Sequence, residues 1–438
     1  MSSPLNSSLE ALKITSEHGS ECDSDGESVY SSDSSRTGVS DSSTLVYSHE
    51  PYETFQSQVL QLCHDLWPTL YQKYTIERLK GGSYNRIIGI NVFGTDPINP
   101  ARLILRVPRF PDERVDRELT TLHFVRQKTK FPVPEVIAFD LTSNNALGKH
   151  YMIQNRLPGA SLRLVYPDLN NRQKCSVAAQ WGRLLLDLHS HSSPVAGLIE
   201  NSTESIQDQD FKVVQFDVGD VFNPAPKINC RSADVPGSET TLGMLEIQFN
   251  RWIADARSLD ASDDLTVDLM ISLLAVAREM DQLGYFDDDN NVLCHLDLEP
   301  RNILLSLEPQ VTISGILDWD SAVFAPIFMS CAPPFWLWGW DDEIDEDEKH
   351  ANDIPPTANL QEIKRTFEDV VGSKILRYTY MAQYRLARRL FQAAISGINS
   401  NEAYKEILDF LKEWDELKLQ NGQSINLDRG RQMWLSSC

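Results

Sequence analysis

The stretch CHLDLEPRNILL, residues 294–305, decides the fold. It carries His295, Asp297 and Asn302 in a short polar run that apolar residues enclose on both sides. Further along, ISGILDWDSA places Asp318 after an apolar run that is typical of a strand. Phosphoryl transfer requires a group that orients the attacking hydroxyl and oxygen ligands for Mg²⁺, but little covalent chemistry from the protein. Asp297, Asn302 and Asp318 supply groups of these kinds.

The composition is that of a globular chain with room for two or three domains, because 41% of its 438 residues are hydrophobic. The formal net charge of −23 repels nucleic-acid phosphates and anionic membrane surfaces, so we expect no nucleic acid and no membrane as a partner. The seven cysteines include no CxxC pair, the N-terminus MSSPLNSSLE lacks the layout of a signal peptide, and no apolar run is long enough for a membrane span. These features predict a soluble, cytoplasmic protein.

The first fifty residues are rich in Ser and acidic residues and contain few large apolar side chains. Such a segment cannot bury enough surface to offset the entropy of ordering, which predicts a disordered tail. Its section SDGESVYSSDSS is either a plain solvated tail or a place for acid-directed phosphorylation, and the composition favours the plain tail.

Hydrophobic patterning then divides the chain into a small strand-rich part and a larger helical part. An amphipathic helix is predicted over 55–71, a β-hairpin over 87–110 around the turn-forming FGTDPINP, and a helix over 112–128. Strand character returns in FPVPEVIAFD and KHYMIQNRL and ends at Pro158-Gly159. Beyond that point the sequence is mostly helical, and two late helices are predicted over about 374–397 and 402–418.

These motifs together resemble the aminoglycoside phosphotransferase and choline kinase-like branch of the protein kinase-like fold, in a fungal-type version. The resemblance rests on CHLDLEPRNILL, GILDWDSA, LKGGSYNRIIGI, and LILRVPR with the downstream DREL, and it extends over most of residues 75–325. It implies an α+β, two-lobed fold with a small antiparallel-sheet N-lobe and a larger helical C-lobe. The expected divisions are a disordered acidic tail (1–50), a nucleotide-binding N-lobe (51–157), a C-lobe with the catalytic loop and the acceptor site (158–420), and a C-terminal tail (421–438).

The resemblance also implies roles for the residues of the opening motif. Asp297 is expected to be the catalytic base or the group that orients the hydroxyl. Asn302 and Asp318 are expected to bind the Mg²⁺ ions that bridge the phosphates of ATP. His295 is expected to hold the loop by hydrogen bonds without touching the substrate.

Two further stretches are expected to contact the nucleotide. Gly81, Gly82 and Ser83 form the turn between the first two strands, where backbone N–H groups can approach phosphates that a Cβ would keep away. The other interpretation of this turn is a plain hairpin. Arg106 occupies the place of the lysine that this fold normally uses on the α and β phosphates, and Glu118 is its matching acid. The other interpretation of Arg106 is an ordinary ion pair on the surface of a strand.

Three stretches leave alternatives open. Asp320 is either a buried structural carboxylate or a residue that assists with metal, and the composition of the motif favours the first. Residues 154–156 join the lobes and are expected to offer backbone groups to an adenine ring. WLWGWDDEIDEDE, residues 336–348, either surrounds a cationic acceptor through aromatic and acidic contacts or is a solvated acidic loop.

The sequence therefore predicts an ATP- and Mg²⁺-dependent phosphotransferase that acts on a hydroxyl of a small molecule, with a cationic amine as a candidate acceptor. The alternative is a nucleotide-binding pseudokinase or interaction protein without turnover, which Arg106 in place of lysine motivates. Protein substrates fit less well, because the apolar, Pro-rich APIFMSCAPPFWLWGW replaces the long activation segment of a protein kinase.

Overall fold

The computed structural model describes residues 49–68, 73–79, 84–93, 100–110, 115–202, 210–215, 240–259, 264–288, 290–339, 348–398 and 400–420. The predictions about the acidic N-terminal tail, about Gly81, Gly82 and Ser83, and about most of the acidic stretch 336–348 fall outside these ranges. Within them, no helix has both the length and the apolar character that a membrane span requires.

A five-stranded antiparallel sheet forms the smaller lobe, with the strand order β1-β2-β3-β5-β4. Its strands are β1 (Lys73–Arg78), β2 (Asn85–Phe93), β3 (Ala101–Pro108), β4 (Val136–Asp140) and β5 (Tyr151–Asn155). The pairing of β2 with β3 confirms the predicted hairpin. Helix α3 (Tyr52–Leu66) covers one face of the sheet, where Phe55 and Val59 pack with Leu103 and Leu105. Because side chains alternate along a strand, Arg106 points to the other face.

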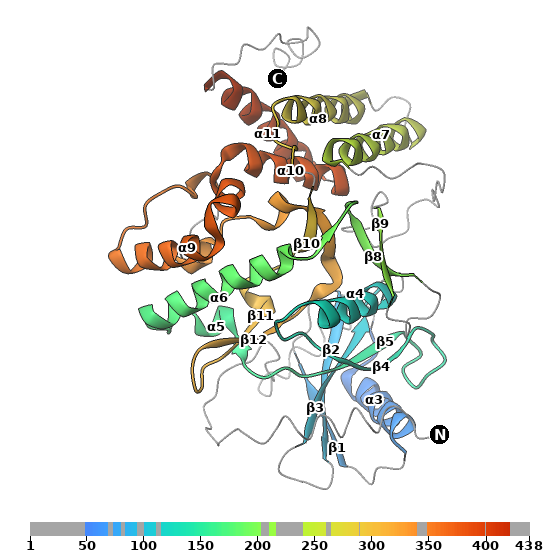
Figure 1. Cartoon of the computed structure of the whole chain (residues 1–438). Helices are drawn as coiled ribbons and strands as arrows, with labels where there is room; N and C mark the ends of the chain where they lie inside the picture. The colour runs from blue at the N-terminus through green and yellow to red at the C-terminus, as the bar shows by residue number, and fades with distance from the viewer. Residues whose placement is uncertain are drawn as a thin grey trace.

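The larger lobe is mainly helical, and Figure 1 shows its helices stacked away from the sheet, with α7, α8, α10 and α11 at the far end of the molecule. Helix α4 (Val115–Lys128) lies between the small sheet and this lobe. The helices of the lobe are α5 (Leu162–Val165), α6 (Asn171–His189), α7 (Thr241–Leu259), α8 (Asp264–Gln282), α9 (Ala358–Tyr380), α10 (Ala382–Ser396) and α11 (Asn401–Gln420). The two-lobed α+β architecture implied by the resemblance is thereby confirmed.

Short strands hold the central loops of this lobe, and β12 corresponds to the apolar run that was predicted before Asp318. One sheet has the order β7-β10-β13-β8-β9 and the other the order β12-β11-β6. Their strands are β6 (Ala160–Ser161), β7 (Ser192–Ser193), β8 (Gly197–Asn201), β9 (Phe211–Gln215), β10 (Asn291–His295), β11 (Ile303–Ser306), β12 (Thr312–Ile316) and β13 (Ala322–Pro326). Since β10 pairs with β13 and β11 pairs with β12, the β10–β11 loop and the β12–β13 loop leave the sheets side by side.

The predicted helix over 374–397 is wrong, whereas the one over 402–418 is confirmed by α11. The backbone of Met381 is extended, with φ −77° and ψ 128°, and it separates α9 from α10. Apolar periodicity continues across this corner, so the sequence pattern concealed it. Tertiary contacts stabilise the break, because Arg388 of α10 folds back and donates to the carbonyl of Tyr378 at the end of α9 (2.9 Å).

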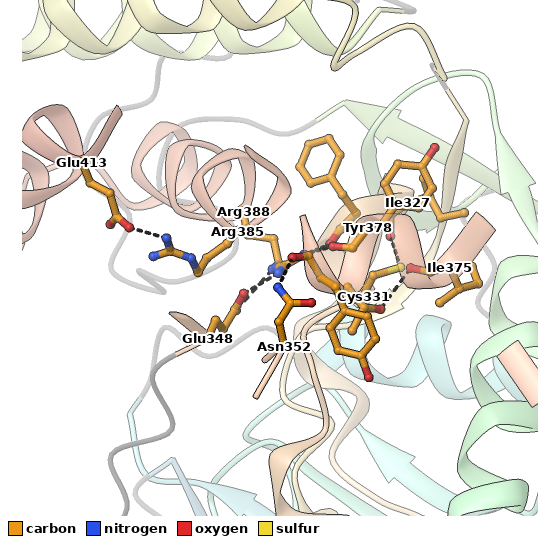
Figure 2. A network of polar contacts seen from close by, with 12 residues as sticks. Ile327, Cys331, Glu348, Asn352, Ile375, Tyr378, Arg385, Arg388 and Glu413 are labelled. Atoms are coloured by element: carbon orange, nitrogen blue, oxygen red, sulfur yellow. Dashed lines mark hydrogen bonds and ion pairs between the residues drawn. The ribbon is translucent and has the colours of Figure 1, made fainter. Parts of the chain in front are cut away.

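Arg388 joins four segments of the larger lobe and is only 6% exposed. Its Nη1 also donates to the carbonyl of Phe328 in the 3₁₀ turn η3 (Ile327–Ser330), at 3.2 Å. Its Nε and Nη2 donate to the carboxylate of Glu348, which begins η5 (Glu348–His350). Figure 2 shows Glu348 and Tyr378 around this guanidinium, with the Arg385–Glu413 pair beside it.

Arg388→Met should lower the free energy of unfolding by about 3–5 kcal/mol, because it leaves Glu348 and two buried carbonyl groups without their donor. Urea denaturation followed by circular dichroism measures this change. The matched control is Arg278→Met, which removes an arginine that is half exposed and paired with Glu246 on the surface. Arg278→Met should lower the free energy of unfolding by less than about 1 kcal/mol. Equal costs for the two variants would contradict the role given to Arg388.

A second prediction concerns His189 at the end of α6, whose Nε2 lies 2.6 Å from Oγ of Ser330. Burial lowers the pKa of His189 from 6.5 to about 4. The unfolded chain therefore binds a proton that the folded chain excludes, so stability is full above pH 6.5 and is lost as the pH falls toward 4. Between about pH 7.5 and about pH 5 this site alone should cost about 2 kcal/mol.

Urea denaturation of the wild type and of His189→Gln at the two pH values measures this loss of stability. The glutamine keeps a polar group near Ser330 but does not titrate. The difference in stability between the two proteins should therefore shift by about 2 kcal/mol in favour of the glutamine variant at the lower pH. An unchanged difference would show that His189 does not carry this dependence.

Candidate active site

The loop between β10 and β11 begins with His295, which is buried between two loops. Its Nε2 donates to the carbonyl of Leu317 at 2.8 Å, and its ring centroid lies 4.6 Å from that of Trp319. Burial lowers the pKa of His295, although the Leu317 carbonyl and the Asp318 carboxylate oppose the shift. The imidazole is thus neutral near pH 7 and ties the β10–β11 loop to the loop that carries Asp318.

Asn302 and Asp297 hold each other within the same loop. Nδ2 of Asn302 donates to Oδ2 of Asp297 at 2.9 Å and to its backbone carbonyl at 2.8 Å. Both hydrogens of the amide therefore face Asp297, and the amide oxygen faces the other way, where it can bind a cation. Pro300 starts the 3₁₀ turn η1 (Pro300–Asn302) that brings the amide back to Asp297. The Asp297 side chain remains 35% exposed, so its carboxylate can meet a second molecule.

Asp318 has an unusual backbone conformation directly after β12. Its φ of 64° and ψ of 61° are left-handed, and among the described residues it alone has a positive φ without being a glycine. Aspartate tolerates this region better than most residues, but the conformation still costs free energy. The strained turn directs the carboxylate toward β3 of the smaller lobe, where it meets Arg106.

The central feature of the site is the guanidinium of Arg106 between two carboxylates. Its Nη2 lies 3.0 Å from Oε1 of Glu118 and 2.9 Å from Oδ1 of Asp318. Arg106 is 8% exposed and Glu118 7%, so the interpretation of Arg106 as an ordinary surface ion pair is wrong. The contact joins β3, α4 and the β12–β13 loop, which the sequence separates widely.

Electrostatics keep this triad fully charged. Burial disfavours the charge on Arg106, but Glu118 and Asp318 more than compensate, so the pKa of Arg106 lies above its ordinary value. Burial likewise opposes ionisation of Asp318, and the nearby Arg106 outweighs it, so the pKa of Asp318 is lowered. Nε of Arg106 is buried and has no hydrogen-bond partner, so it is an unsatisfied donor at the edge of the site.

Asp320 differs from its predicted role, because its side chain is exposed and not buried. Two effects raise the pKa of Asp320 to about 6: desolvation by the surrounding protein is the larger, and repulsion by the Asp318 carboxylate is the second. Since the residue is exposed, repulsion by Asp318 is the cause we consider decisive. Asp320 therefore faces the site as a further acidic group, and the structural alternative does not hold.

An apolar cluster between the lobes was missed by the sequence analysis. It combines residues of the smaller lobe with residues of β11 and the β12–β13 loop. The cluster consists of Leu79, Ile87, Ile104, Leu304 and Leu317. Leu157 packs against it. These residues are far apart in the sequence, and only the alternation along β2 and β3 indicated that a second face of the sheet was apolar. The cluster lies on the same face of β3 as Arg106.

The segment that links the two lobes, residues 154–159, was predicted only in part. The break at Pro158-Gly159 is real: Gly159 has φ 108°, and a Cβ there would come within 2.6 Å of the Leu305 carbonyl oxygen. However, the backbone N–H groups of Asn155 and Arg156 donate to the carbonyls of Glu135 and Arg102, at 2.9 Å each. These two N–H groups are therefore bound within the protein, and the expectation that residues 154–156 offer backbone groups to an adenine ring stays a prediction for the other backbone groups of the segment.

The chemistry of the donors fits a magnesium nucleotide. Carboxylate and amide oxygens are the ligands that Mg²⁺ prefers, and it is usually held by one or two carboxylates together with substrate phosphates. A buried guanidinium with an unsatisfied donor suits a phosphate oxygen. Asp318 and the Asn302 amide supply the first kind of group and Arg106 supplies the second, so the residues present fit both components.

Comparison with known proteins identifies the family of the chain. Residues 75–362 match the sequence model of the phosphotransferase enzyme family. The chain therefore belongs to the phosphotransferase enzyme family, and the sequence-based recognition of this family is confirmed.

Curated relatives are distant. Subtelomeric hrmA-associated cluster proteins from two strains of Aspergillus fumigatus are each 23% identical over 334 residues, which cover 65% of this chain and 62% of theirs. The alignment thus spans less than two thirds of the length of these relatives.

Solved structures of similar outline are aminoglycoside phosphotransferases. The GDP complex of aminoglycoside 2'-phosphotransferase-IIIa is 15% identical with a TM-score of 0.42, and it covers 82% of this chain and 97% of its own. Aminoglycoside phosphotransferase APH(4)-Ia is 16% identical with a TM-score of 0.42 and the same two coverages.

A double-mutant cycle tests the buried triad independently of function. Arg106→Met should lower the free energy of unfolding by about 3–5 kcal/mol, because it removes the cation that the Glu118 and Asp318 carboxylates share. Adding Glu118→Leu should recover at least about 1 kcal/mol of that loss, since it removes one of the two carboxylates that shared this cation. Chemical denaturation of the wild type, the two single variants and the double variant measures the coupling. Strictly additive effects would contradict a direct Arg106–Glu118 contact.

Proposed function

We propose that this protein is an ATP- and Mg²⁺-dependent phosphotransferase that acts on a hydroxyl group of a small molecule. The observation that carries the proposal is the convergence of Arg106, Asp318 and the Asp297–Asn302 pair from the two lobes onto one site. Membership in the phosphotransferase enzyme family supports it.

In this proposal each residue of the site has one role. Asp297 accepts a hydrogen bond from the acceptor hydroxyl and orients its oxygen for attack, because its carboxylate is held by Asn302 and is still partly exposed. The Asn302 amide oxygen and the Asp318 carboxylate hold Mg²⁺. Arg106 binds a phosphate with the donors of its guanidinium. When bound, Mg²⁺ supplies the positive charge that neutralises the phosphate oxygens. His295 positions the loop without touching either substrate.

The nucleotide base has a matching surface in the interlobe apolar cluster defined above. Ile104 and Leu304 are fully buried, so a flat aromatic base would meet this cluster at its rim, where Ile87 is 9% exposed and Leu157 is partly buried. Gly81, Gly82 and Ser83 lie between β1 and β2 in the sequence, and we propose that their backbone N–H groups contact the phosphates.

The charge of the site favours a cationic acceptor such as an amine. Asp297 and Asp318 are partly exposed, and Asp320 is exposed beside them, in a chain whose formal charge is −23. We also propose a cytoplasmic location, which the free thiols of the described cysteines support. The other candidate function is a nucleotide-binding pseudokinase, which the arginine at position 106 favours, since its planar fork replaces a compact ammonium.

Turnover distinguishes the two candidates. Purified protein with Mg-ATP and a panel of amines and sugars should form ADP, and Asp297→Ala should reduce the rate at least about a hundredfold while leaving nucleotide affinity within about threefold. Mg-ATP at a hundredfold excess over its Kd should stabilise both proteins by about 2.7 kcal/mol, which a thermal shift detects. Magnesium without nucleotide is the control for the thermal shift.

The outcomes separate cleanly. Nucleotide binding without ADP formation on every acceptor would favour the pseudokinase. The absence of any stabilisation by Mg-ATP would overturn the shared premise of a nucleotide site. A rate that is unaffected by Asp297→Ala would remove Asp297 from the reaction.

A further inference from the structure

Arg301 is a cation of the β10–β11 loop to which the proposed function gives no role. It lies four residues after Asp297 on the 3₁₀ turn η1, and its Nη2 donates to Oδ1 of Asp297. Asn302 occupies the other oxygen of the same carboxylate. Both oxygens of Asp297 are therefore held, one by the amide and one by the guanidinium.

The guanidinium of Arg301 is placed where a reacting phosphate would need it. An acceptor hydroxyl hydrogen-bonded to Asp297 would lie within one hydrogen bond of Oδ1 or Oδ2, and the phosphoryl group joins that same hydroxyl oxygen during transfer. A guanidinium has five N–H donors, and Nη2 of Arg301 uses one of them on Asp297. Since the side chain is 50% exposed, it can turn toward a bound molecule without breaking a buried contact.

The acidic groups around Arg301 can accommodate a cation on the acceptor side. Asp297, Asp318 and Asp320 are all acidic, and Glu299 adds a fourth carboxylate, with Oε2 at 3.8 Å from Nη1 of Arg301. Arg106 is buried on the other side of the site between Glu118 and Asp318. In the described loop 295–302, Arg301 is the basic residue that reaches solvent.

We propose that Arg301 binds the oxygens of the phosphoryl group as it passes from nucleotide to acceptor, and that it does so from the acceptor side of Asp297. The inference rests on the proposed function. The reaction itself breaks the bond between the terminal phosphorus and the bridging oxygen of ATP and forms one between that phosphorus and the acceptor oxygen, while the hydroxyl proton leaves toward Asp297. Arg301 is unchanged; its positive charge stabilises the equatorial oxygens, where negative charge is spread during transfer.

Binding of stable analogues tests this role without relying on turnover. The wild type, Arg301→Ala and Arg301→Lys are titrated by calorimetry with Mg-AMP-PNP, which represents the bound nucleotide before transfer, and with Mg-ADP plus aluminium fluoride, which represents the phosphoryl group in transit. Arg301→Ala should bind the aluminium fluoride complex at least about tenfold more weakly and Mg-AMP-PNP within about twofold of wild type. Arg301→Lys should fall between the two, because it keeps the charge but loses the fork.

A second readout is rescue. Guanidinium ions at millimolar concentration should restore part of the ADP-forming rate of Arg301→Ala and should not accelerate the wild type. Arg183→Ala, which removes an exposed arginine of α6, is the matched control and should behave as wild type in both assays.

The inference is overturned if Arg301→Ala binds both analogues as wild type does, or if it loses affinity for both equally, since Arg301 would then act on the ground state or only shape the loop. Failure of the wild type to bind Mg-AMP-PNP would instead overturn the proposed function. Unchanged circular dichroism and melting temperature of the variant show that the loss is local.

Discussion

The ion pair between the buried Arg106 and the partly exposed Asp318 is the interaction on which the rest of the structure depends. It connects the central strand β3 of the small sheet to the loop that follows β12, and Glu118 of α4 binds the same guanidinium. Removing charges from water is expensive, so such a contact persists only where both partners are held in place. The surrounding fold provides that restraint: β3 is paired on both sides, and Asp318 is fixed in a left-handed turn.

The two loops that carry the candidate site residues are joined to each other. Nε2 of His295 donates to the carbonyl of Leu317, and the N–H of Leu317 donates to the carbonyl of Asn302. Hydrogen bonds buried in this way favour a single geometry. In contrast, Asp297, Asp320 and Arg301 keep part of their surface in solvent, and we propose that the acceptor enters there.

Much of the site followed from the sequence, because its residues lie in short motifs with fixed spacing. Asp297 and Asn302 are five positions apart, and a single turn brings them together. The pairing of Arg106 with Glu118, which the resemblance implied, is also present, and the structure adds the contact of the same guanidinium with Asp318. What escaped prediction depends on long-range packing. The interlobe cluster draws on five separate segments, and the corner at Met381 follows from a hydrogen bond between two helices, so neither leaves a local pattern.

Asn302 illustrates a chemical vulnerability of this architecture. Its amide donates twice to Asp297, and a spontaneous loss of ammonia from the side chain would replace those donors with a second carboxylate. Two negative charges would then face each other across the distance now spanned by a hydrogen bond, and the loop would have to open. Burial of Asn302, at 7% exposure, and the entry of the next residue into β11 restrict the backbone motion that this ageing reaction requires. The packing of the loop therefore also protects the lifetime of the molecule.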